Sequence, residues 1–143
     1  MDRFVVGFAF SNCDDPESRK VLLVKKQRPQ WQKGRLNGIG GKIEGNETPW
    51  AAMDRESLEE AGLFLDWQYR GILKGTNFDG HPFECHLFYA YSSKVEEFRQ
   101  REDESLGLYD PGALSGYKIV DSLDFLIPFG LSGDQKPFMT LIY

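Results

Sequence analysis

A single α/β domain is predicted by three features of this sequence: its length, its strand-like apolar runs, and one helix whose two ends are clearly marked. The chain has 143 residues, which suits one domain large enough to bury a sizeable core. Strand-like runs occupy residues 3–10 and 20–26 before the helix, and residues 63–74 and 82–91 after it. Strand runs on both sides of a helix indicate that a sheet and helices pack together in one fold.

Each pair of strand-like runs is separated by a polar, turn-rich loop, so we expect each pair to form an antiparallel hairpin. Residues 94–104 are highly charged and are expected to form a helix or a loop, ahead of a short apolar run at 106–109. Residues 120–131 are expected to end a strand and then form a C-terminal helix. The tail, 137–143 (PFMTLIY), could add a last strand.

The helix is predicted at residues 49–61 because both of its ends carry typical capping residues. Thr48 can cap the amino end with its side-chain oxygen, and Pro49 suits the first helical position. Gly62 stands where a residue in the left-handed conformation would end the helix. The boundaries are therefore set by local chemistry on each side.

Three acidic residues of this helix, Glu56, Glu59 and Glu60, have a spacing that puts them on one ridge. Carboxylates at this spacing repel one another, and the helix interior contains no lysine to offset the repulsion. A solvated acidic face would explain the charges but not their density. Oxygen ligands gathered on one ridge are the ligands that Mg²⁺ and Mn²⁺ prefer, so the pattern predicts a divalent-metal site.

The stretch from Gly41 to Leu63 resembles the signature of the Nudix hydrolase family, G-x5-E-x7-R-E-U-x-E-E-x-G-U, where U is a bulky apolar residue. The matching residues are Gly41, Glu47, Arg55, Glu56, Glu59, Glu60, Gly62 and Leu63. The single departure is Ser57, where the family carries an apolar residue. Ser57 shares a helix face with Trp50, Met53 and Ala61, so we expect a core position that costs packing but removes no ligand.

The resemblance implies a fold and a set of roles. The fold is an α/β/α sandwich, with a mixed sheet between helices. Metal ligands would be the side chains of Glu56, Glu59 and Glu60 and the carbonyl oxygen of Gly40. Arg55 would pair with Glu47 and orient the helix carboxylates rather than touch the substrate.

Family members hydrolyse a nucleoside diphosphate linked to a further group, by attack of water on a phosphorus atom. Divalent metals stabilise the negative charge that builds up and help to deprotonate the water. The general base is either Glu59 or an extra glutamate in the loop before residue 106. Glu104 is the best-placed candidate in that loop, with Glu102 and Glu97 behind it.

Substrate contacts are predicted on both sides of the motif. The segment 27–36 (QRPQWQKGRL) is basic and could form either a solvated loop or a rim that faces the substrate phosphates; Arg28 and, beside the motif glycine, Lys42 are the candidates. The stretch KGRLNGIGGKIE is similar to that of the Nudix triphosphatases that act on oxidised purine nucleotides. That similarity makes Asn37 a candidate base contact, although a turn-forming role explains it nearly as well. Asp121 is a second candidate, with helix capping as its alternative.

The preferred substrate is a (deoxy)nucleoside triphosphate, with an oxidised purine as one candidate base. Residues 78–81 lack the proline typical of ADP-ribose hydrolases and the tyrosine typical of dinucleoside-polyphosphate hydrolases. ADP-ribose or a nucleotide sugar remains an alternative. A catalytically inactive nucleotide-binding module is a second alternative, which the intact glutamate set disfavours, and a messenger-RNA decapping role is disfavoured by the acidic balance.

The net charge of −5 argues against broad nucleic-acid or anionic-membrane binding. The partner is expected to be a small nucleotide, and a homodimer is compatible with the family. The two cysteines, Cys13 and Cys85, lack metal-ligand spacing and are interpreted as free thiols in a reducing compartment. No signal peptide or membrane span is recognised, so a cytoplasmic location is expected.

Overall fold

Strand β1 (Asp2–Phe10) lies inside an eight-stranded mixed sheet. The structure is a computed structural model, and it describes residues 1–11, 15–77, 79–132 and 138–142. Cys13 and Phe78 lie outside the described residues. The other strands are β2 (Val21–Lys25), β3 (Leu36–Asn37), β4 (Ile39–Lys42), β5 (Gln68–Thr76), β6 (Pro82–Tyr91), β7 (Ser105–Tyr109) and β8 (Met139–Ile142). The main path through the sheet is β3-β2-β1-β6-β5-β8; β4 pairs with β1, and β7 pairs with β2. The β1–β6 and β5–β8 pairs are parallel and the others are antiparallel.

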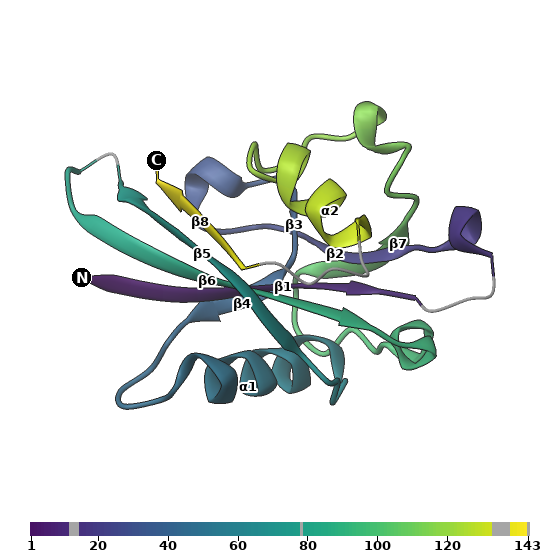
Figure 1. Cartoon of the computed structure of the whole chain (residues 1–143), viewed down its shortest axis with the longest axis horizontal. Coiled ribbons are helices and arrows are strands. Elements are labelled where there is room, and N and C mark those ends of the chain that lie inside the picture. Colours follow the sequence, from purple (N-terminus) through teal and green to yellow (C-terminus); the bar gives the residue numbers. More distant parts are fainter. Residues whose placement is uncertain (12–14, 78, 133–137, 143) are drawn as a thin grey trace.

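Two helices cover opposite faces of this sheet, α1 (Pro49–Ala61) on one and α2 (Leu123–Leu131) on the other (Figure 1). Short 3-10 turns at Pro16–Ser18, Gln30–Gln32, Ser93–Glu97 and Leu114–Gly116 complete the regular structure. The predicted α/β/α sandwich is therefore confirmed. Among the described helices, none is long and apolar enough to cross a bilayer.

The alternation of side chains along β1 explains how the sheet serves both helices. Val5 and Ala9 are buried in the cluster that contains Met53 of α1. Phe8 and its neighbours on the other side are buried in the cluster that contains Leu126 of α2. A strand covered on both faces reads as one continuous apolar run, which is what residues 3–10 show.

Helix α1 begins and ends at the residues that the sequence predicts. The Thr48 hydroxyl accepts a hydrogen bond from the Ala51 amide at 3.1 Å, and Gly62 has φ 66°. The expected hairpins are also present: β1 pairs with β2, and β5 pairs with β6. The charged segment 94–104 forms only the 3-10 turn at Ser93–Glu97 and then a loop.

The strand after α1 starts later than predicted, at Gln68 rather than at residue 63. Leu63, Leu65 and Trp67 are buried, but their backbone belongs to the turn that leaves the helix. The Leu63 amide donates a hydrogen bond to the Ser57 carbonyl oxygen, and the Trp67 amide donates one to the Leu65 carbonyl oxygen. These two amides are therefore not available for hydrogen bonds to a neighbouring strand. Apolar composition alone could not distinguish this buried turn from a strand.

Ser57 is fully buried, as expected, but it does more than leave a packing defect. Its hydroxyl donates a 2.8 Å hydrogen bond to the Leu63 carbonyl oxygen, which fastens the end of α1 to the following turn. Trp50, expected on the same core face, is half exposed. It lies at the margin of the core, where it makes an edge contact with Tyr69.

Candidate active site

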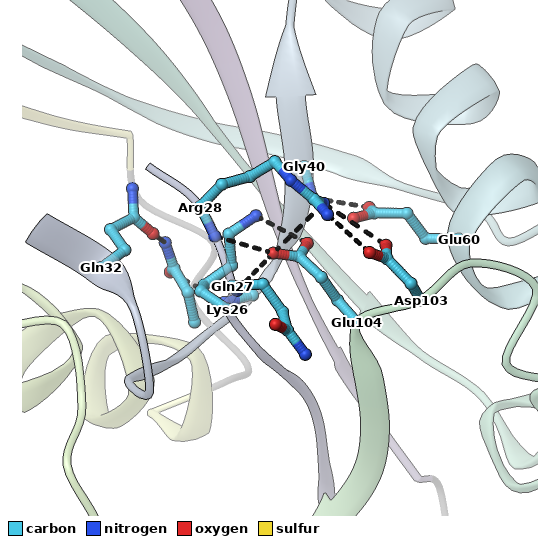
Figure 2. Close-up of polar contacts among 10 residues, drawn as sticks. Lys26, Gln27, Arg28, Gln32, Gly40, Glu60, Asp103 and Glu104 are labelled. Carbon is cyan, nitrogen blue, oxygen red and sulfur yellow. Dashed lines mark hydrogen bonds and ion pairs between the residues drawn. The ribbon is translucent and has the colours of Figure 1, made fainter. Parts of the chain in front are cut away.

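Glu60 is the most buried of the three helix carboxylates, with 7% of the residue exposed. One of its oxygens accepts a 3.0 Å hydrogen bond from the Gly40 amide in β4 (Figure 2). Burial, and then the charge of Glu56, raise the pKa of Glu60 to about 8. Near neutral pH this carboxyl therefore holds a proton that a cation could displace.

Glu56 lies directly against the backbone of Gly41. A Cβ atom on Gly41 would collide with the Glu56 carboxylate, so the motif glycine leaves the space that this carboxylate occupies. Burial is the main reason that the pKa of Glu56 is raised, and the charges of Glu59 and Glu102 add to it. The site thus concentrates negative charge that it does not fully compensate.

Arg55 connects the loop before α1 to the carboxylates on the helix. Its guanidinium donates to both oxygens of Glu47, at 2.7 and 2.9 Å, and to one oxygen each of Glu56 and Glu59, at 3.0 and 3.2 Å. A further bond reaches the Lys42 carbonyl oxygen at 3.1 Å. Hydrogen bonding to Arg55 lowers the pKa of Glu47 to about 2. The pairing expected between Arg55 and Glu47 is present.

Each of the three helix carboxylates keeps one oxygen without a hydrogen-bond partner among the described residues. Glu56 and Glu59 each use one oxygen on Arg55, and Glu60 uses one on Gly40. Three free carboxylate oxygens on one ridge fit the donor chemistry of Mg²⁺ or Mn²⁺. Within the described ranges, however, no three or more His, Cys, Asp or Glu side chains are already grouped closely enough to hold an ion.

The loop before β7 is fastened to the carboxyl end of α1. The amides of Arg99 and Arg101 donate to the carbonyl oxygens of Ala61 and Glu60, at 2.9 and 3.2 Å. These bonds satisfy carbonyl groups that a helix end leaves unpaired. They also bring Glu102 within electrostatic reach of Glu56 and Glu60, because its charge contributes to raising the pKa of both.

Glu104, the loop glutamate favoured from the sequence, is buried, with 6% of the residue exposed. It accepts hydrogen bonds from the Gln27 amide at 2.6 Å, the Arg28 amide at 3.3 Å and the Lys26 ammonium at 3.1 Å (Figure 2). Burial opposes its ionisation, but the bonds from Gln27 and Lys26 outweigh burial and hold the pKa of Glu104 below its usual value. Glu104 therefore anchors the segment after β2.

The two candidate base contacts lie on neighbouring segments. Leu36, beside Asn37, forms a parallel bridge with Ile119, two residues before Asp121. The Asn37 amide donates to the Gln32 side chain at 3.0 Å. Asp121 is exposed, and its carboxylate lies 3.7 Å from the Arg35 guanidinium. The residue at the cap position of α2 is Ser122, and no side-chain capping bond is found there among the described residues.

Both candidate phosphate contacts are paired with acids. Arg28 makes an ion pair with Asp103 at 2.5 Å, and Lys42 makes one with Asp2 at 3.3 Å. A phosphate would have to compete with these partners.

Three participants were not identified from the sequence: Lys26 as the partner of Glu104, Gln32 as the partner of Asn37, and Arg101 beside Glu59. Each depends on segments that are distant in sequence or irregular in structure. The basic composition of residues 27–36 gave only a general signal that this region is important.

Comparison with known proteins identifies the family of this chain. A model of the NUDIX domain matches residues 3–140. The oxidized purine nucleoside triphosphate hydrolase of Mus musculus is 37% identical over 76 residues, which cover 52% of this chain and 48% of that protein. The chain spans about half the length of the curated relatives it matches.

Two solved structures share the fold. A MutT protein from Bacillus halodurans superimposes with a TM-score of 0.72 at 19% identity, covering 100% of this chain and 90% of that one. The NUDIX domain of Shewanella oneidensis NrtR, complexed with ADP ribose, gives a TM-score of 0.73 at 16% identity, covering 88% of this chain and 83% of that one. At these identities the likeness concerns the fold alone.

Proposed function

This chain belongs to the Nudix family, and we propose that it is a metal-dependent pyrophosphohydrolase whose substrate is a (deoxy)nucleoside triphosphate. The products would be the nucleoside monophosphate and pyrophosphate. The observation that carries this proposal is the ridge of Glu56, Glu59 and Glu60, each of which keeps one free carboxylate oxygen beside the glycine-rich strand β4.

Mg²⁺ or Mn²⁺ would be held by these three carboxylates together with the Gly40 carbonyl oxygen. When bound, a divalent ion neutralises phosphate charge and lowers the pKa of bound water. The protein would supply the space and the backbone geometry around the ion. Gly41 leaves room for the Glu56 carboxylate, and a Cβ on Gly40 would collide with the backbone of Val5 in β1.

Arg55 and Glu47 have a positioning role in this proposal. Arg55 reaches Glu47 with two nitrogens and the helix carboxylates with a third, so it fixes the direction in which Glu56 and Glu59 point. None of these bonds requires a substrate. Its contribution to catalysis would therefore act through the carboxylates.

Glu59 is our choice for the general base. It is the most exposed of the three helix glutamates and is held by one Arg55 bond. Glu104 is a poor base because both of its oxygens accept hydrogen bonds and its pKa is lowered. Glu102, exposed and electrostatically coupled to Glu56 and Glu60, is the better loop candidate.

A purine base, oxidised purine included, is favoured by two observations. Asn37 and Asp121 lie on neighbouring segments, which are joined by the bridge between Leu36 and Ile119. The curated relative is named an oxidized purine nucleoside triphosphate hydrolase. Arg28 and Lys42 would contribute to phosphate binding only by exchanging their present acidic partners.

ADP-ribose or a nucleotide sugar is the second candidate, since the structurally similar NrtR domain is complexed with ADP ribose. An inactive binding module is the third. Glu59→Gln separates enzyme from binder: an enzyme loses turnover by orders of magnitude with its fold intact, whereas a binder changes little.

The test of substrate is product identification by chromatography with Mg²⁺ present. The panel contains common and oxidised (d)NTPs, ADP-ribose, NADH, dinucleoside polyphosphates and nucleotide sugars. Monophosphate and pyrophosphate from triphosphates alone support the proposal. Cleavage of ADP-ribose alone would contradict the proposed triphosphate substrate. No turnover of any compound would contradict the proposed hydrolase activity.

A further inference from the structure

The loop that carries Arg101 has a fixed position relative to the helix carboxylates. The Arg101 amide donates a hydrogen bond to the carbonyl oxygen of Glu60, and the Arg99 amide donates one to the carbonyl oxygen of Ala61. The Arg101 side chain also lies across the helix end: its Cδ atom is 3.3 Å from the point where a Cβ on Gly62 would stand. Because Gly62 has no side chain and a positive φ, this path over the helix end is open.

Arg101 lines an open groove of about 380 Å³ together with Leu58, Glu59 and Glu102. Two of these residues are carboxylates: Glu59, our choice for the general base, and Glu102, the alternative in the loop. The groove therefore borders the ridge of Glu56, Glu59 and Glu60.

Among the described residues, Arg101 has no acidic partner, unlike three other cations near the site. Arg55 pairs with Glu47, Arg28 with Asp103 and Lys26 with Glu104, at distances of 2.5–3.1 Å. Among the residues that the structure describes, Arg101 makes no ion pair within 4.0 Å, although Glu59 and Glu102 line the same groove. Its guanidinium keeps its donors available for an incoming anion.

A simpler explanation is that Arg101 only stabilises the negative end of the α1 dipole. Arg99 tests this explanation within the same loop. It has the same charge and its amide makes the same kind of bond to the helix end, but it does not line the groove. A dipole effect should be shared by both arginines, whereas an anion contact should belong to Arg101 alone.

We propose that Arg101 binds the terminal phosphates of the nucleotide, the part that leaves as pyrophosphate. This rests on the proposed function. During hydrolysis with pyrophosphate as the leaving group, the water oxygen forms a bond to the α-phosphorus. The bond from this phosphorus to the oxygen shared with the β-phosphorus breaks, and that oxygen keeps the electron pair and leaves with the pyrophosphate. The water proton passes to the general base and then to solvent. Arg101 donates hydrogen bonds to oxygens of the terminal phosphates in the bound nucleotide and is itself unchanged.

The experiment compares Arg101→Gln, Arg101→Lys and Arg99→Gln with the unmodified chain. KM and kcat are measured for the best triphosphate of the panel, with Mg²⁺ in excess. Arg101→Gln should lose about tenfold or more in kcat/KM, mainly through KM, because a charged hydrogen bond is lost. Arg101→Lys should recover part of the loss, and Arg99→Gln should stay within about twofold.

A second measurement separates failure of this inference from failure of the proposed function. Inorganic pyrophosphate with Mg²⁺ is titrated into each variant by calorimetry, which needs no turnover. Binding that weakens by about tenfold or more in Arg101→Gln alone supports the phosphate contact even if no substrate is cleaved. Equal behaviour of Arg99→Gln and Arg101→Gln, unchanged kinetics, or no pyrophosphate binding by the unmodified chain would overturn it.

Discussion

Arg55 binds Glu47 through two parallel hydrogen bonds, from its Nε and Nη2 atoms, at 2.7 and 2.9 Å. The same guanidinium uses its remaining nitrogen on Glu56 and Glu59. One planar group therefore ties the loop before α1 to two of the carboxylates proposed to hold metal. Lysine cannot reproduce this arrangement, because its ammonium lacks the rigid, planar set of donors.

Arg55→Lys should keep the charge but lose the geometry. We expect kcat to fall by about 100-fold, since displaced catalytic groups commonly cost that much, and the free energy of unfolding to fall by about 1–3 kcal/mol. Steady-state kinetics and urea denaturation measure the two effects. Glu44→Gln is the matched control: Glu44 lies 3.8 Å from Arg55 and its side chain is 70% exposed, so little should change. Full activity in Arg55→Lys would contradict the positioning role.

The Glu47–Arg55 pair should also affect how the stability of the chain depends on pH in acidic solution. Hydrogen bonding to Arg55 holds the pKa of Glu47 at about 2, against an ordinary value of 4.5. A lowered carboxyl pKa contributes stability that is present above the unfolded-state value and is lost as pH falls through the folded-state value. Part of the stability should therefore disappear between pH 4.5 and about 2. In Glu47→Gln that part of the pH dependence should be absent; identical acid profiles would argue against the pair.

At higher pH, the Glu60 carboxyl should make the stability of the folded chain change with pH in the opposite direction. Burial and the charge of Glu56 raise its pKa to about 8, so the metal-free folded chain holds a proton that the unfolded chain releases above pH 4.5. Stability without metal should thus decline as pH rises from 4.5 to about 8. Mg²⁺ must displace this proton, and its affinity should therefore increase over the same range.

Thermal unfolding at pH 6 and pH 8, with and without Mg²⁺, measures this coupling. The stabilisation by Mg²⁺ should be larger at pH 8 in the unmodified chain. Glu60→Gln should remove both the pH dependence and most of the Mg²⁺ effect. An Mg²⁺ effect that is equal at both pH values would be incompatible with a protonated Glu60.

The parts of the site that could be predicted from sequence are those fixed by neighbouring residues. Thr48, Pro49 and Gly62 determine where α1 begins and ends, and the helical repeat alone puts Glu56 and Glu60 on one ridge. The Arg55–Glu47 pair could be expected from the family signature. These features require no knowledge of how distant segments meet.

The parts that could not be predicted depend on contacts between distant segments. Glu104 is a candidate general base from the sequence, but the sequence does not predict that Lys26 and the amide of Gln27, at the end of β2, bind its carboxylate. Arg101 is one of several charged residues in its segment, and the backbone hydrogen bonds from Arg99 and Arg101 to the end of α1 bring it beside Glu59. Sequence patterns carry no record of such loop docking.

Ser57 offers a test of how this chain tolerates a polar residue in the core of its signature helix. Its hydroxyl satisfies the Leu63 carbonyl oxygen at 2.8 Å in a fully buried position. Ser57→Ala should cost about 1–3 kcal/mol because that oxygen loses its partner. Ser57→Leu, which restores the family's residue type, should also cost about 1–3 kcal/mol through overpacking. Urea denaturation measures both, and a more stable Ser57→Leu would show that the cavity accepts a larger side chain.

Base recognition provides the last prediction. If Asn37 and Asp121 read a purine edge, Asn37→Ala and Asp121→Ala should each lower kcat/KM for purine triphosphates by about tenfold or more, because hydrogen bonds to the base are lost. Pyrimidine triphosphates, which lack that edge, should be affected much less. Gln32→Ala is an informative companion, since Gln32 accepts a 3.0 Å hydrogen bond from Asn37 and should act only through it. Its effect should therefore vanish in the Asn37→Ala background. Equal losses for purines and pyrimidines would mean that these residues support the fold of the site rather than select the base.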